Sequence, residues 1–429
     1  MEGRDGIRVN SPRLLPWSGG SIDIPGTRSL CGSTLTRQIE HGVRVRVLFS
    51  SIGAVGHVYP MVPLARALAS AGHEVRWACS PEVCPMIDQA GIQTVPAGMT
   101  MVSRQAHRDD LRAEFATLTP DEQTDRMVGW MFGELLAPAM LDDLLPVVRS
   151  WRPALLVHDS MDFAGPIAAT AVDAVHVTHS YGPLTSEHRI AAISDRVGTL
   201  WEGVGSEPRP YGGLYDHLYL DIYPPSMQAA GGSQVGRRQL LRPVPYPPWD
   251  GTHLAALADD PERPLVYLTF GTEIPDDGPL RLVIAAIRDQ DMRLLVTVGP
   301  HRDPDAFGPQ PHNVIIERFV PQAAVLPHAA AVISHGGSGT VLAALGAGVP
   351  QLCLPFLADQ PLNARAVSDA GVGIALDVST LDDKQVADAL TRLLTEASFG
   401  QRARSVASEI AQMPSPDEVA SAIVELATA

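Results

Sequence analysis

Apolar residues along the chain fall into short continuous runs that alternate with segments of helical periodicity. The runs at residues 43–50 and 74–79 each predict a buried β-strand. Between them, a helix is predicted from about Pro60 until Gly72 ends it, and its apolar side chains recur at helical spacing: Met61, Leu64, Ala65 and Leu68. A strand, a helix and a strand in this order form the βαβ unit from which parallel sheets are built.

The same alternation continues through the first half of the chain. Residues 154–158 predict a buried strand that ends at Asp159, residues 163–172 a helix, and residues 175–179 the next strand. Residues 108–149 read as helical throughout, which is typical of a variable lid or of a region that binds an acceptor molecule.

Prolines become frequent between residues 222 and 264, and their density predicts a linker without regular structure. The strand and helix alternation starts again after this segment. Strands are predicted, with helices between them, at residues 265–269, 293–298, 314–317, 332–334, 351–354 and 374–376. Helices are predicted to end the chain, at residues 382–396, 399–413 and 416–427.

These elements predict an α/β protein with two Rossmann-like domains, whose parallel sheets face each other across a cleft. Residues 1–42 lack hydrophobic periodicity and a secretory apolar core, so we interpret them as a flexible N-terminal extension or an over-long start. The other predicted segments are an N-terminal domain at 43–240, a linker at 241–264, a C-terminal domain at 265–410, and a helix at 411–429 that packs back on the N-terminal domain.

Composition and charge exclude several classes of function. The formal net charge is −16 and no cluster of Lys and Arg occurs, which argues against nucleic acid and against an anionic membrane surface as partners. No apolar run approaches the roughly 20 residues that span a bilayer. The cysteines have no zinc-type spacing and are typical of buried thiols in a reducing cytoplasm: Cys31, Cys79, Cys84 and Cys353.

A glycine-rich loop, residues 334–340, follows a predicted strand and opens a predicted helix. Glycines allow the backbone to come close to an anion, and the free N–H groups of a helix N-terminus favour phosphate there. His335 adds a hydrogen-bond donor. A tight turn without a ligand explains a glycine run of this length equally well.

A second candidate site follows the first strand, where His57 lies near the carboxyl end of the sheet. Imidazole is the best placed side chain to deprotonate an alcohol at neutral pH. Asp159 ends a neighbouring strand and could fix the imidazole tautomer, with Asp162 as the alternative. Capping of a helix N-terminus is the structural alternative for all three residues.

The C-terminal half carries motifs at the spacing of a known family. Together they resemble the donor-binding motif of family 1 glycosyltransferases. They are residues 319–322, the glycine loop, residues 348–350, and the pair Asp359 and Gln360 followed by Asn363. Members of this family have the two-domain GT-B fold. The sequence is most similar to bacterial enzymes that glycosylate macrolides, aromatic polyketides and enediynes, and residues 223–228 resemble a segment found in those enzymes.

The resemblance assigns nucleotide-sugar binding to the C-terminal domain and acceptor binding to the N-terminal one. It implies that Phe319 contacts the nucleobase, that the backbone of Val320 bonds the base, and that Gln322 lies near the ribose. The residues implied to bind the diphosphate are Thr272, His335, Gly337, Ser338, Gly339 and Thr340. Asp359 and Gln360 are implied to hold hydroxyls of the transferred sugar.

The motif around His57, residues 56–60, resembles the family loop whose histidine is the general base, and the family often has an aspartate at the position of Asp159. The chain departs from many UDP-sugar enzymes at Ala343, where they carry a glutamate that binds both ribose hydroxyls. This departure favours a dTDP-sugar, because a 2′-deoxyribose lacks one of those hydroxyls.

The resemblance therefore implies an inverting, metal-independent glycosyltransferase without a cofactor, which uses a nucleotide sugar as co-substrate. It moves a deoxysugar to a hydroxyl of a small natural-product aglycone in antibiotic biosynthesis. The chain is expected in the cytoplasm, and a homodimer is one assembly that the sequence allows. Alternatives are a UDP-glucose-dependent enzyme that inactivates antibiotics, a nucleotide-sugar epimerase or hydrolase of the same fold, and a non-catalytic partner.

Overall fold

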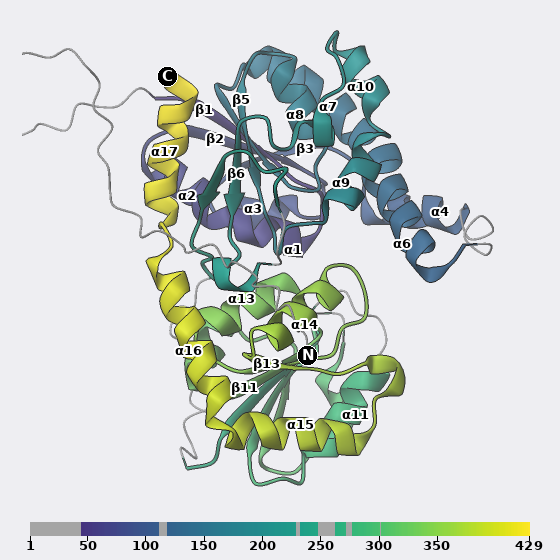
Figure 1. The fold of residues 1–429 in the computed structure, drawn as a ribbon, viewed down its shortest axis with the longest axis vertical. Coiled ribbons are helices and arrows are strands. Elements are labelled where there is room, and N and C mark those ends of the chain that lie inside the picture. Colours follow the sequence, from purple (N-terminus) through teal and green to yellow (C-terminus); the bar gives the residue numbers. More distant parts are fainter. Residues whose placement is uncertain (1–43, 111–117, 229–231, 248–261, 272–276, 301) are drawn as a thin grey trace, which may run out of the picture. The chain divides into compact units, whose positions relative to one another are not determined.

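The computed structural model describes residues 44–110, 118–228, 232–247, 262–271, 277–300 and 302–429 (Figure 1). Residues 44–429 form one compact unit. The predicted extension, residues 1–42, lies outside the described residues, as do Thr272 and most of the predicted linker. The division into an N-terminal and a C-terminal domain therefore stays a prediction at those boundaries.

The described strands form two parallel sheets, one of seven strands and one of six. The first sheet has the order β3-β2-β1-β4-β5-β6-β7, formed by Gln93–Pro96, Glu74–Cys79, Arg46–Ser50, Leu155–Asp159, Val175–His179, Leu218–Asp221 and Arg238–Leu240. The second has the order β10-β9-β8-β11-β12-β13, formed by Val314–Glu317, Arg293–Thr297, Leu265–Thr269, Ala329–Ser334, Gln351–Cys353 and Gly373–Ala375.

Helices connect the parallel strands in both halves (Figure 1). Those of the first half are α1 Val55–Val58, α2 Val62–Ser70, α3 Cys84–Gln89, α4 Met101–Asp110, α6 Pro120–Gly129, α7 Ala137–Trp151, α8 Ala164–Thr170, α9 Glu187–Ser194 and α10 Gly198–Gly203. Those of the second half are α11 Gly278–Ile287, α12 Gln322–Val325, α13 Ser338–Gly346, α14 Gln360–Asp369, α15 Asp383–Thr395, α16 Ala397–Gln412 and α17 Pro416–Thr428.

Both sheets are buried on their two faces, which explains why their strands are continuous apolar runs. In β1, Val47 and Phe49 belong to one hydrophobic cluster and Leu48 belongs to another on the opposite face. In β8, Leu268 and Tyr267 are divided in the same way. Each fully buried large apolar side chain contributes about 2 kcal/mol of transfer free energy, so these strands hold the loops at their ends in place.

The C-terminal helix α17 packs against α2 of the first half, and the two lie side by side in Figure 1. Its apolar side chains Val419 and Ile423 join the cluster that also contains Leu64 and Leu68 of α2. Ser415 and Glu418 form a capping box at the start of α17, which fixes where this helix begins.

The predicted lack of regular structure between residues 222 and 264 is wrong at Arg238–Leu240, which forms β7 and pairs with β6. The prolines after residue 242 do not interrupt it, because the nearest, Pro243, comes after the strand. Two other short strands, β3 and β6, were not predicted, since runs of four residues carry little periodicity.

Candidate functional site

His57 lies at the carboxyl end of the first sheet, where the chain leaves β1. It belongs to the single turn α1, and its side chain is 15% exposed. Nδ1 of His57 lies 2.9 Å from Oδ2 of Asp159, whose side chain is fully buried at the end of β4. Strands β1 and β4 are neighbours in the sheet, so their ends bring these two side chains together.

This contact fixes the tautomer of His57. A carboxylate only accepts hydrogen bonds, so Nδ1 carries the proton and donates a hydrogen bond to Asp159. Nε2 is then free of its proton and can accept one from a hydroxyl group. The same carboxylate stabilises the imidazolium that forms when Nε2 takes up that proton.

Asp162, the alternative partner, has a different role in the structure. Its carboxylate accepts hydrogen bonds from the backbone N–H groups of Ala164 and Gly165 at the start of α8, and from the hydroxyl of Ser50 at 2.6 Å. Burial, together with the negative charge of Asp159, raises the pKa of Asp162 to about 6. Asp162 therefore caps a helix, and Asp159 is the carboxylate that contacts His57.

The glycine loop follows β11 and opens α13, as the sequence predicted. Gly336 has a φ of +78°, a conformation that favours glycine, and a Cβ at this position would lie 3.3 Å from the carbonyl oxygen of Gln360. Gly337 is the N-cap residue of α13 and has no side chain to satisfy the first N–H groups of the helix. This helix end is therefore open to an anion.

A carboxylate occupies part of that helix end in this structure. Oδ2 of Asp359 accepts hydrogen bonds from the backbone N–H of Ser338 at 3.2 Å and from its hydroxyl at 2.6 Å. Asn363, which is fully buried, donates to the same oxygen at 2.8 Å and to the Ser338 hydroxyl at 2.9 Å. The sequence placed Asn363 in the motif but gave it no role, and here it joins Asp359 to the glycine loop.

Gln360, predicted to hold a sugar hydroxyl, uses its amide oxygen within its own loop. Oε1 accepts hydrogen bonds from the backbone N–H groups of Phe356 at 2.8 Å and Leu357 at 3.0 Å. The residue is 5% exposed. Its side chain thus shapes the turn before α14, and only its amide N–H groups could serve a ligand.

His335 belongs to the glycine loop, and its ring lies against the loop after β8. A Cβ on Gly271 would come within 2.9 Å of the His335 ring, so glycine is needed there for the two loops to approach. Burial lowers the pKa of His335 to about 4, against the opposing influence of Asp359. The ring is therefore neutral at pH 7 and can act as a hydrogen-bond donor, not as a positive charge.

The predicted nucleoside-binding residues follow β10. The side chain of Phe319 is 55% exposed, and Val320 is partly buried against an apolar cluster. Gln322 begins α12 and donates a hydrogen bond from Nε2 to Oγ1 of Thr340 at 3.0 Å. The structure thus joins Gln322 to Thr340 of α13, while Phe319 presents an aromatic ring to solvent.

Family models match most of the chain. The models described as erythromycin biosynthesis protein CIII-like cover residues 66–247 for the N-terminal domain and residues 281–426 for the C-terminal domain. The elloramycin glycosyltransferase ElmGT of Streptomyces olivaceus is 33% identical over 392 residues, which cover 88% of this chain and 96% of the relative. The chain belongs to this family of glycosyltransferases.

Other comparisons agree with this assignment. The 10-deoxymethynolide desosaminyltransferase of Streptomyces venezuelae is 30% identical, over 89% of this chain and 97% of the relative. The crystal structure of the glycosyltransferase VinC in complex with dTDP superposes with a TM-score of 0.72 at 28% identity, covering 89% of this chain and 99% of VinC. The predicted family, the predicted GT-B fold and the predicted glycosyltransferase activity are thereby confirmed, whereas the roles of individual site residues stay predictions.

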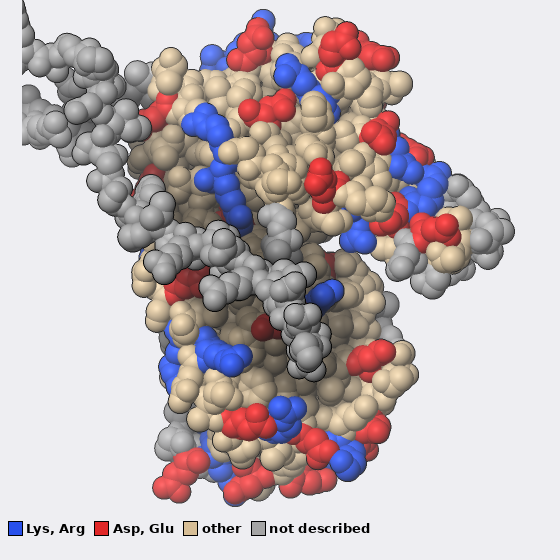
Figure 2. Space-filling view, in the orientation of Figure 1, with Lys and Arg blue, Asp and Glu red and all other residues tan. Residues whose placement is uncertain are grey.

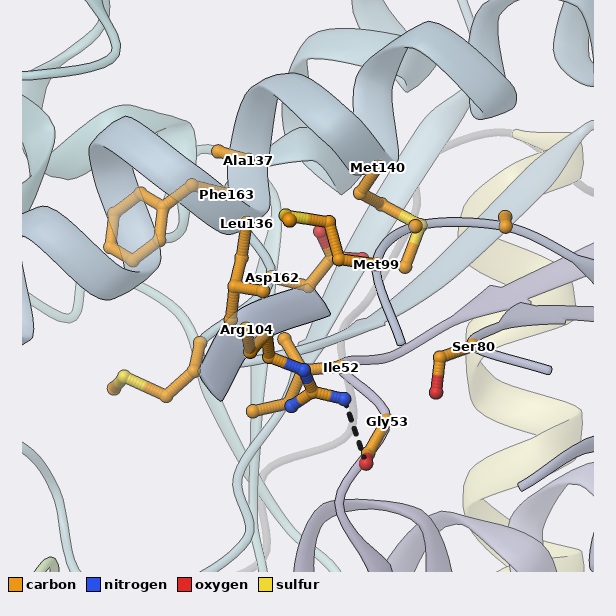
Figure 3. A pocket seen from close by; sticks show the side chains of 13 residues that line it. Ile52, Gly53, Ser80, Met99, Arg104, Leu136, Ala137, Met140, Asp162 and Phe163 are labelled. Atoms are coloured by element: carbon orange, nitrogen blue, oxygen red, sulfur yellow. Dashed lines mark hydrogen bonds between the residues drawn. The ribbon is translucent and has the colours of Figure 1, made fainter. Parts of the chain in front are cut away.

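A pocket of this glycosyltransferase lies beside the His57 loop (Figure 3). Arg104 of α4 donates a hydrogen bond at 3.1 Å to the carbonyl oxygen of Gly53, which precedes the loop. The larger apolar side chains that line the pocket are Ile52, Met99, Leu136, Met140, Met161 and Phe163. Ile52 follows β1, Met99 precedes α4, Leu136 and Met140 belong to the region predicted to bind the acceptor, and Met161 and Phe163 follow β4.

Other apolar residues of that region do not line this pocket. Trp130 is 8% exposed and belongs to the hydrophobic core, as do the partly buried Met131 and Phe132 around it. Phe115 lies outside the described residues. Equal helical spacing of apolar residues could not separate pocket from core, because both positions are apolar.

Two residues of this glycosyltransferase site were not predicted, Tyr181 and Gly182, which follow β5. The ring of Tyr181 lies against the ring of His57, with centroids 4.0 Å apart. A Cβ on Gly182 would lie 2.0 Å from the Ser338 hydroxyl oxygen and 3.8 Å from Oδ2 of Asp359. Their place directly after a predicted strand was the available signal, since the same rule pointed to His57 and Asp159.

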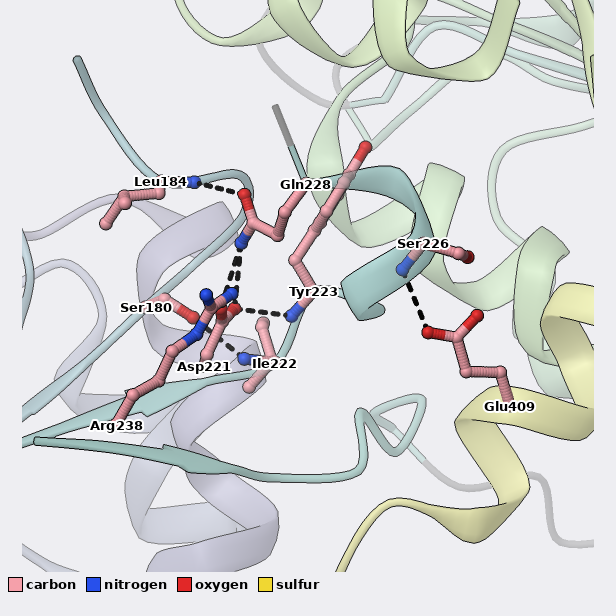
Figure 4. A network of polar contacts seen from close by, with 9 residues as sticks. All are labelled: Ser180, Leu184, Asp221, Ile222, Tyr223, Ser226, Gln228, Arg238 and Glu409. Atoms are coloured by element: carbon pink, nitrogen blue, oxygen red, sulfur yellow. Dashed lines mark hydrogen bonds and ion pairs between the residues drawn. The ribbon is translucent and has the colours of Figure 1, made fainter. Parts of the chain in front are cut away.

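The segment at residues 223–228, which resembles one found in antibiotic glycosyltransferases, forms part of a polar network (Figure 4). Nε2 of Gln228 donates to both carboxylate oxygens of Asp221, which also pairs with Arg238 of β7. The backbone N–H of Ser226 donates to Glu409 of α16 at 2.9 Å. The segment therefore has a structural role, linking β6 and β7 to the C-terminal half.

Charged side chains of both signs are mixed on the face drawn in Figure 2, without a broad basic area. Among the described residues, no helix is long and apolar enough to cross a bilayer. Within the same part of the chain, no group of three or more His, Cys, Asp or Glu side chains is arranged to hold a metal ion.

Proposed function

We propose that this glycosyltransferase moves a deoxysugar from a dTDP-sugar to a hydroxyl group of a polyketide-type aglycone, with inversion at the anomeric carbon. The observation that carries the proposal is the 2.9 Å contact between Nδ1 of His57 and the buried carboxylate of Asp159. This pair is a general base suited to an alcohol acceptor, because the carboxylate holds the proton on Nδ1, leaves Nε2 as the hydrogen-bond acceptor and stabilises the imidazolium formed on proton transfer.

The thymidine nucleotide is supported by relatives and by one residue of α13. VinC was solved in complex with dTDP, and another relative is named a TDP-daunosamine transferase. Ala343 is 8% exposed and its short side chain packs in an apolar cluster. Alanine offers no carboxylate for a pair of ribose hydroxyls, so the site suits a 2′-deoxyribose.

The aglycone class is supported by the names of relatives, and an apolar pocket lies beside the His57 loop. Relatives are named for sugar transfer to 10-deoxymethynolide and to tylactone. The pocket has an apolar wall that includes Met99, Leu136 and Met140. As it stands this pocket has room for about one water molecule, so it offers an apolar surface beside the loop that carries His57 and not a cavity for a ring system.

In the proposed reaction, Nε2 of His57 takes the proton of the acceptor hydroxyl as its oxygen forms a bond to the anomeric carbon. The bond between that carbon and the diphosphate oxygen breaks, and its electron pair leaves with the nucleotide. The N-terminus of α13 and the neutral ring of His335 stabilise the negative charge on the departing diphosphate. No metal takes part in this scheme.

We infer a cytoplasmic location from the thiols, because the described cysteines Cys79, Cys84 and Cys353 are buried and free. Acceptor binding by residues 43–240 and donor binding by residues 265–410 are part of the same proposal. A homodimer stays a prediction from the sequence.

The proposal is tested by mass spectrometry of products formed from matched dTDP- and UDP-sugars with macrolide and aromatic polyketide aglycones. We expect a glycoside from the dTDP-sugar. His57→Ala should lower turnover by about 10²-fold or more, while the affinity for dTDP, measured by calorimetry, stays unchanged. His188→Ala is the control, since its side chain is 76% exposed.

Each part of the proposal has its own contrary outcome. A clear preference for the UDP-sugar would contradict the donor assignment. Near-normal transfer by His57→Ala to an unactivated hydroxyl would contradict the base assignment. Release or isomerisation of the sugar without an acceptor would indicate a hydrolase or an epimerase instead.

A further inference from the structure

An aromatic ring lies against the proposed base. Tyr181, two residues after the end of β5, has its ring centroid 4.0 Å from that of His57, with an angle of 31° between the ring planes. Strands β4 and β5 are neighbours, so Tyr181 approaches the imidazole from the strand next to the one that carries Asp159. His57 is thus contacted by a carboxylate and by a ring.

The segment that carries Tyr181 is held on both sides (Figure 4). Before it, the backbone N–H of Ser180 donates to the carbonyl of Leu220, and the hydroxyl of Ser180 accepts from the N–H of Ile222, both at 2.9 Å. After it, the N–H of Leu184 donates to Oε1 of Gln228 at 3.1 Å. These bonds fix the backbone on either side of the aromatic residue.

The hydroxyl of Tyr181 remains protonated throughout the working pH range. Burial raises its pKa far above the usual value, and the negative charges of Asp359 and Asp159 raise it further. A phenol in this state neither donates its proton to solvent nor acts as a base. What the residue offers His57 is therefore the face of a neutral ring.

A single hydrogen bond does not fix an imidazole. The side chain is held at Cγ by its covalent bond and at Nδ1 by Asp159, but small changes in χ1 and χ2 can still tilt the ring and move Nε2. The backbone gives little help, because α1 is one turn of four residues and its N-cap has no side-chain hydrogen bond. A second contact on the ring face limits this tilt.

We propose that Tyr181 is a positioning residue, whose ring fixes the plane of the His57 imidazole so that Nδ1 stays on Asp159 and Nε2 points to the acceptor hydroxyl. The proposal rests on the function proposed above for His57. The ring face also favours the imidazolium that forms during transfer, since aromatic faces attract cations.

The proposal is tested with Tyr181→Ala and Tyr181→Phe. Tyr181→Ala should lower kcat by about tenfold, because small errors in the position of a reacting group are costly, and should leave the KM for the donor within about twofold. Tyr181→Phe keeps the ring and should be close to the wild type. Tyr211→Ala is a matched control, since that tyrosine contacts Tyr215 and Glu187 and not His57.

A spectroscopic signal reports the contact directly. The ring current of Tyr181 should shift the His57 Cε1 proton in the NMR spectrum, and the shift should persist in Tyr181→Phe and disappear in Tyr181→Ala. This measurement does not depend on turnover, so a variant with altered stability can still be judged by it.

A double-mutant cycle separates this proposal from the one on which it rests. If Tyr181 acts through His57, Tyr181→Ala should have no further effect on turnover in the His57→Ala background. The positioning role would be overturned if Tyr181→Ala lowered turnover equally in the wild-type and His57→Ala backgrounds. It would also be overturned if Tyr181→Phe lowered turnover as much as Tyr181→Ala. Near-normal turnover of His57→Ala by itself would instead overturn the base assignment.

Discussion

Tyr181 and Gly182 are adjacent residues that contact opposite partners. Tyr181 lies on the proposed base, whereas Gly182 lies against Ser338 of the glycine loop. Their effects on catalysis should therefore differ, although one peptide bond separates them. Tyr181 is expected to affect the chemical step, and Gly182 the binding of the donor.

Gly182→Ala tests this separation. The new Cβ would lie 2.0 Å from Oγ of Ser338, so the glycine loop or the segment after β5 must move. We expect the KM for the donor to rise by about tenfold, which corresponds to about 1.4 kcal/mol. The measurement is initial-rate kinetics at varied donor concentration.

Gly346→Ala is the matched control for Gly182→Ala. It lies at the end of α13 and has no atom within 4 Å of its added Cβ. It should leave the KM unchanged and stabilise the helix slightly, because glycine is unfavourable in helices. An unchanged donor KM in Gly182→Ala would show that the loop absorbs the methyl group.

The residues at strand ends show how far the sequence alone can lead. The approach of His57 to Asp159 could be expected, because His57 follows one strand, Asp159 ends the neighbouring one, and both side chains are suited to catalysis. Tyr181 follows a strand too, but from sequence alone a tyrosine at such a position is interpreted as a residue that packs in the core. The hydrogen bonds of Gln360 within its own loop could not be expected from a motif either.

At the scale of elements, helices and long strands were predictable from local pattern. Strands β2, β5, β8 and β10 have the predicted bounds. Among them β8 is buried along its whole length, which explains its clear apolar run. Strand β7 was missed, since it has three residues and lies in a proline-rich stretch. Its place in the sheet depends on pairing with β6, which is information that the local sequence does not hold.

The segment after β5 depends on a side chain distant in the sequence, and Gln228→Ala tests this dependence. The change removes the acceptor for the Leu184 N–H and two hydrogen bonds to Asp221. We expect a loss of about 1 kcal/mol in the free energy of unfolding, together with a lower kcat, because the support of Tyr181 is weakened. Urea unfolding and steady-state kinetics measure the two effects.

Gln239→Ala is the control for this element, since its side chain bonds only to the neighbouring carbonyl of Leu240 among the described contacts. A stability loss in Gln228→Ala with an unchanged kcat would mean that the segment after β5 keeps its position without this support.

For the molecule as a whole, buried histidines make stability depend on pH. Burial lowers the pKa of His158, His179 and His335 to about 4 each, from an ordinary value of 6.5. Between those values the unfolded chain binds more protons, so the free energy of unfolding falls as the pH falls from 6.5 to 4. Asp162, with its pKa raised to about 6, acts in the opposite direction, as do Asp216 and Asp221, whose pKa values burial also raises. Burial lowers the pKa of three more histidines, His73, His176 and His217, so the histidines outnumber these carboxylates.

We expect the free energy of unfolding, measured with urea, to decrease by several kcal/mol between pH 7 and pH 4. A tenfold difference in proton affinity between the folded and the unfolded chain corresponds to about 1.4 kcal/mol for each group. His335→Gln should reduce this decrease, because one of the buried histidines is removed. His188→Gln should keep the wild-type dependence, since that side chain is 76% exposed. Equal stability at both pH values would contradict the prediction.

The sequence did not predict the lowered pKa values of the histidines, nor the contacts between distant loops. The reason is the same for both. Both depend on which residues become neighbours after folding, as with Gly182 and Ser338, and not on local pattern. The resemblance to a family could predict a site because the family motifs contain residues that come together only after folding.

The carboxylate of Asp359 at the start of α13 has a consequence for selectivity. It already balances the positive end of the helix. In the proposed function the diphosphate of the donor would therefore replace one anion with another, and the hydroxyl groups of the sugar would offer the displaced carboxylate new hydrogen bonds. Inorganic phosphate brings no such hydroxyl groups, so we expect it to compete poorly with the donor for this helix end.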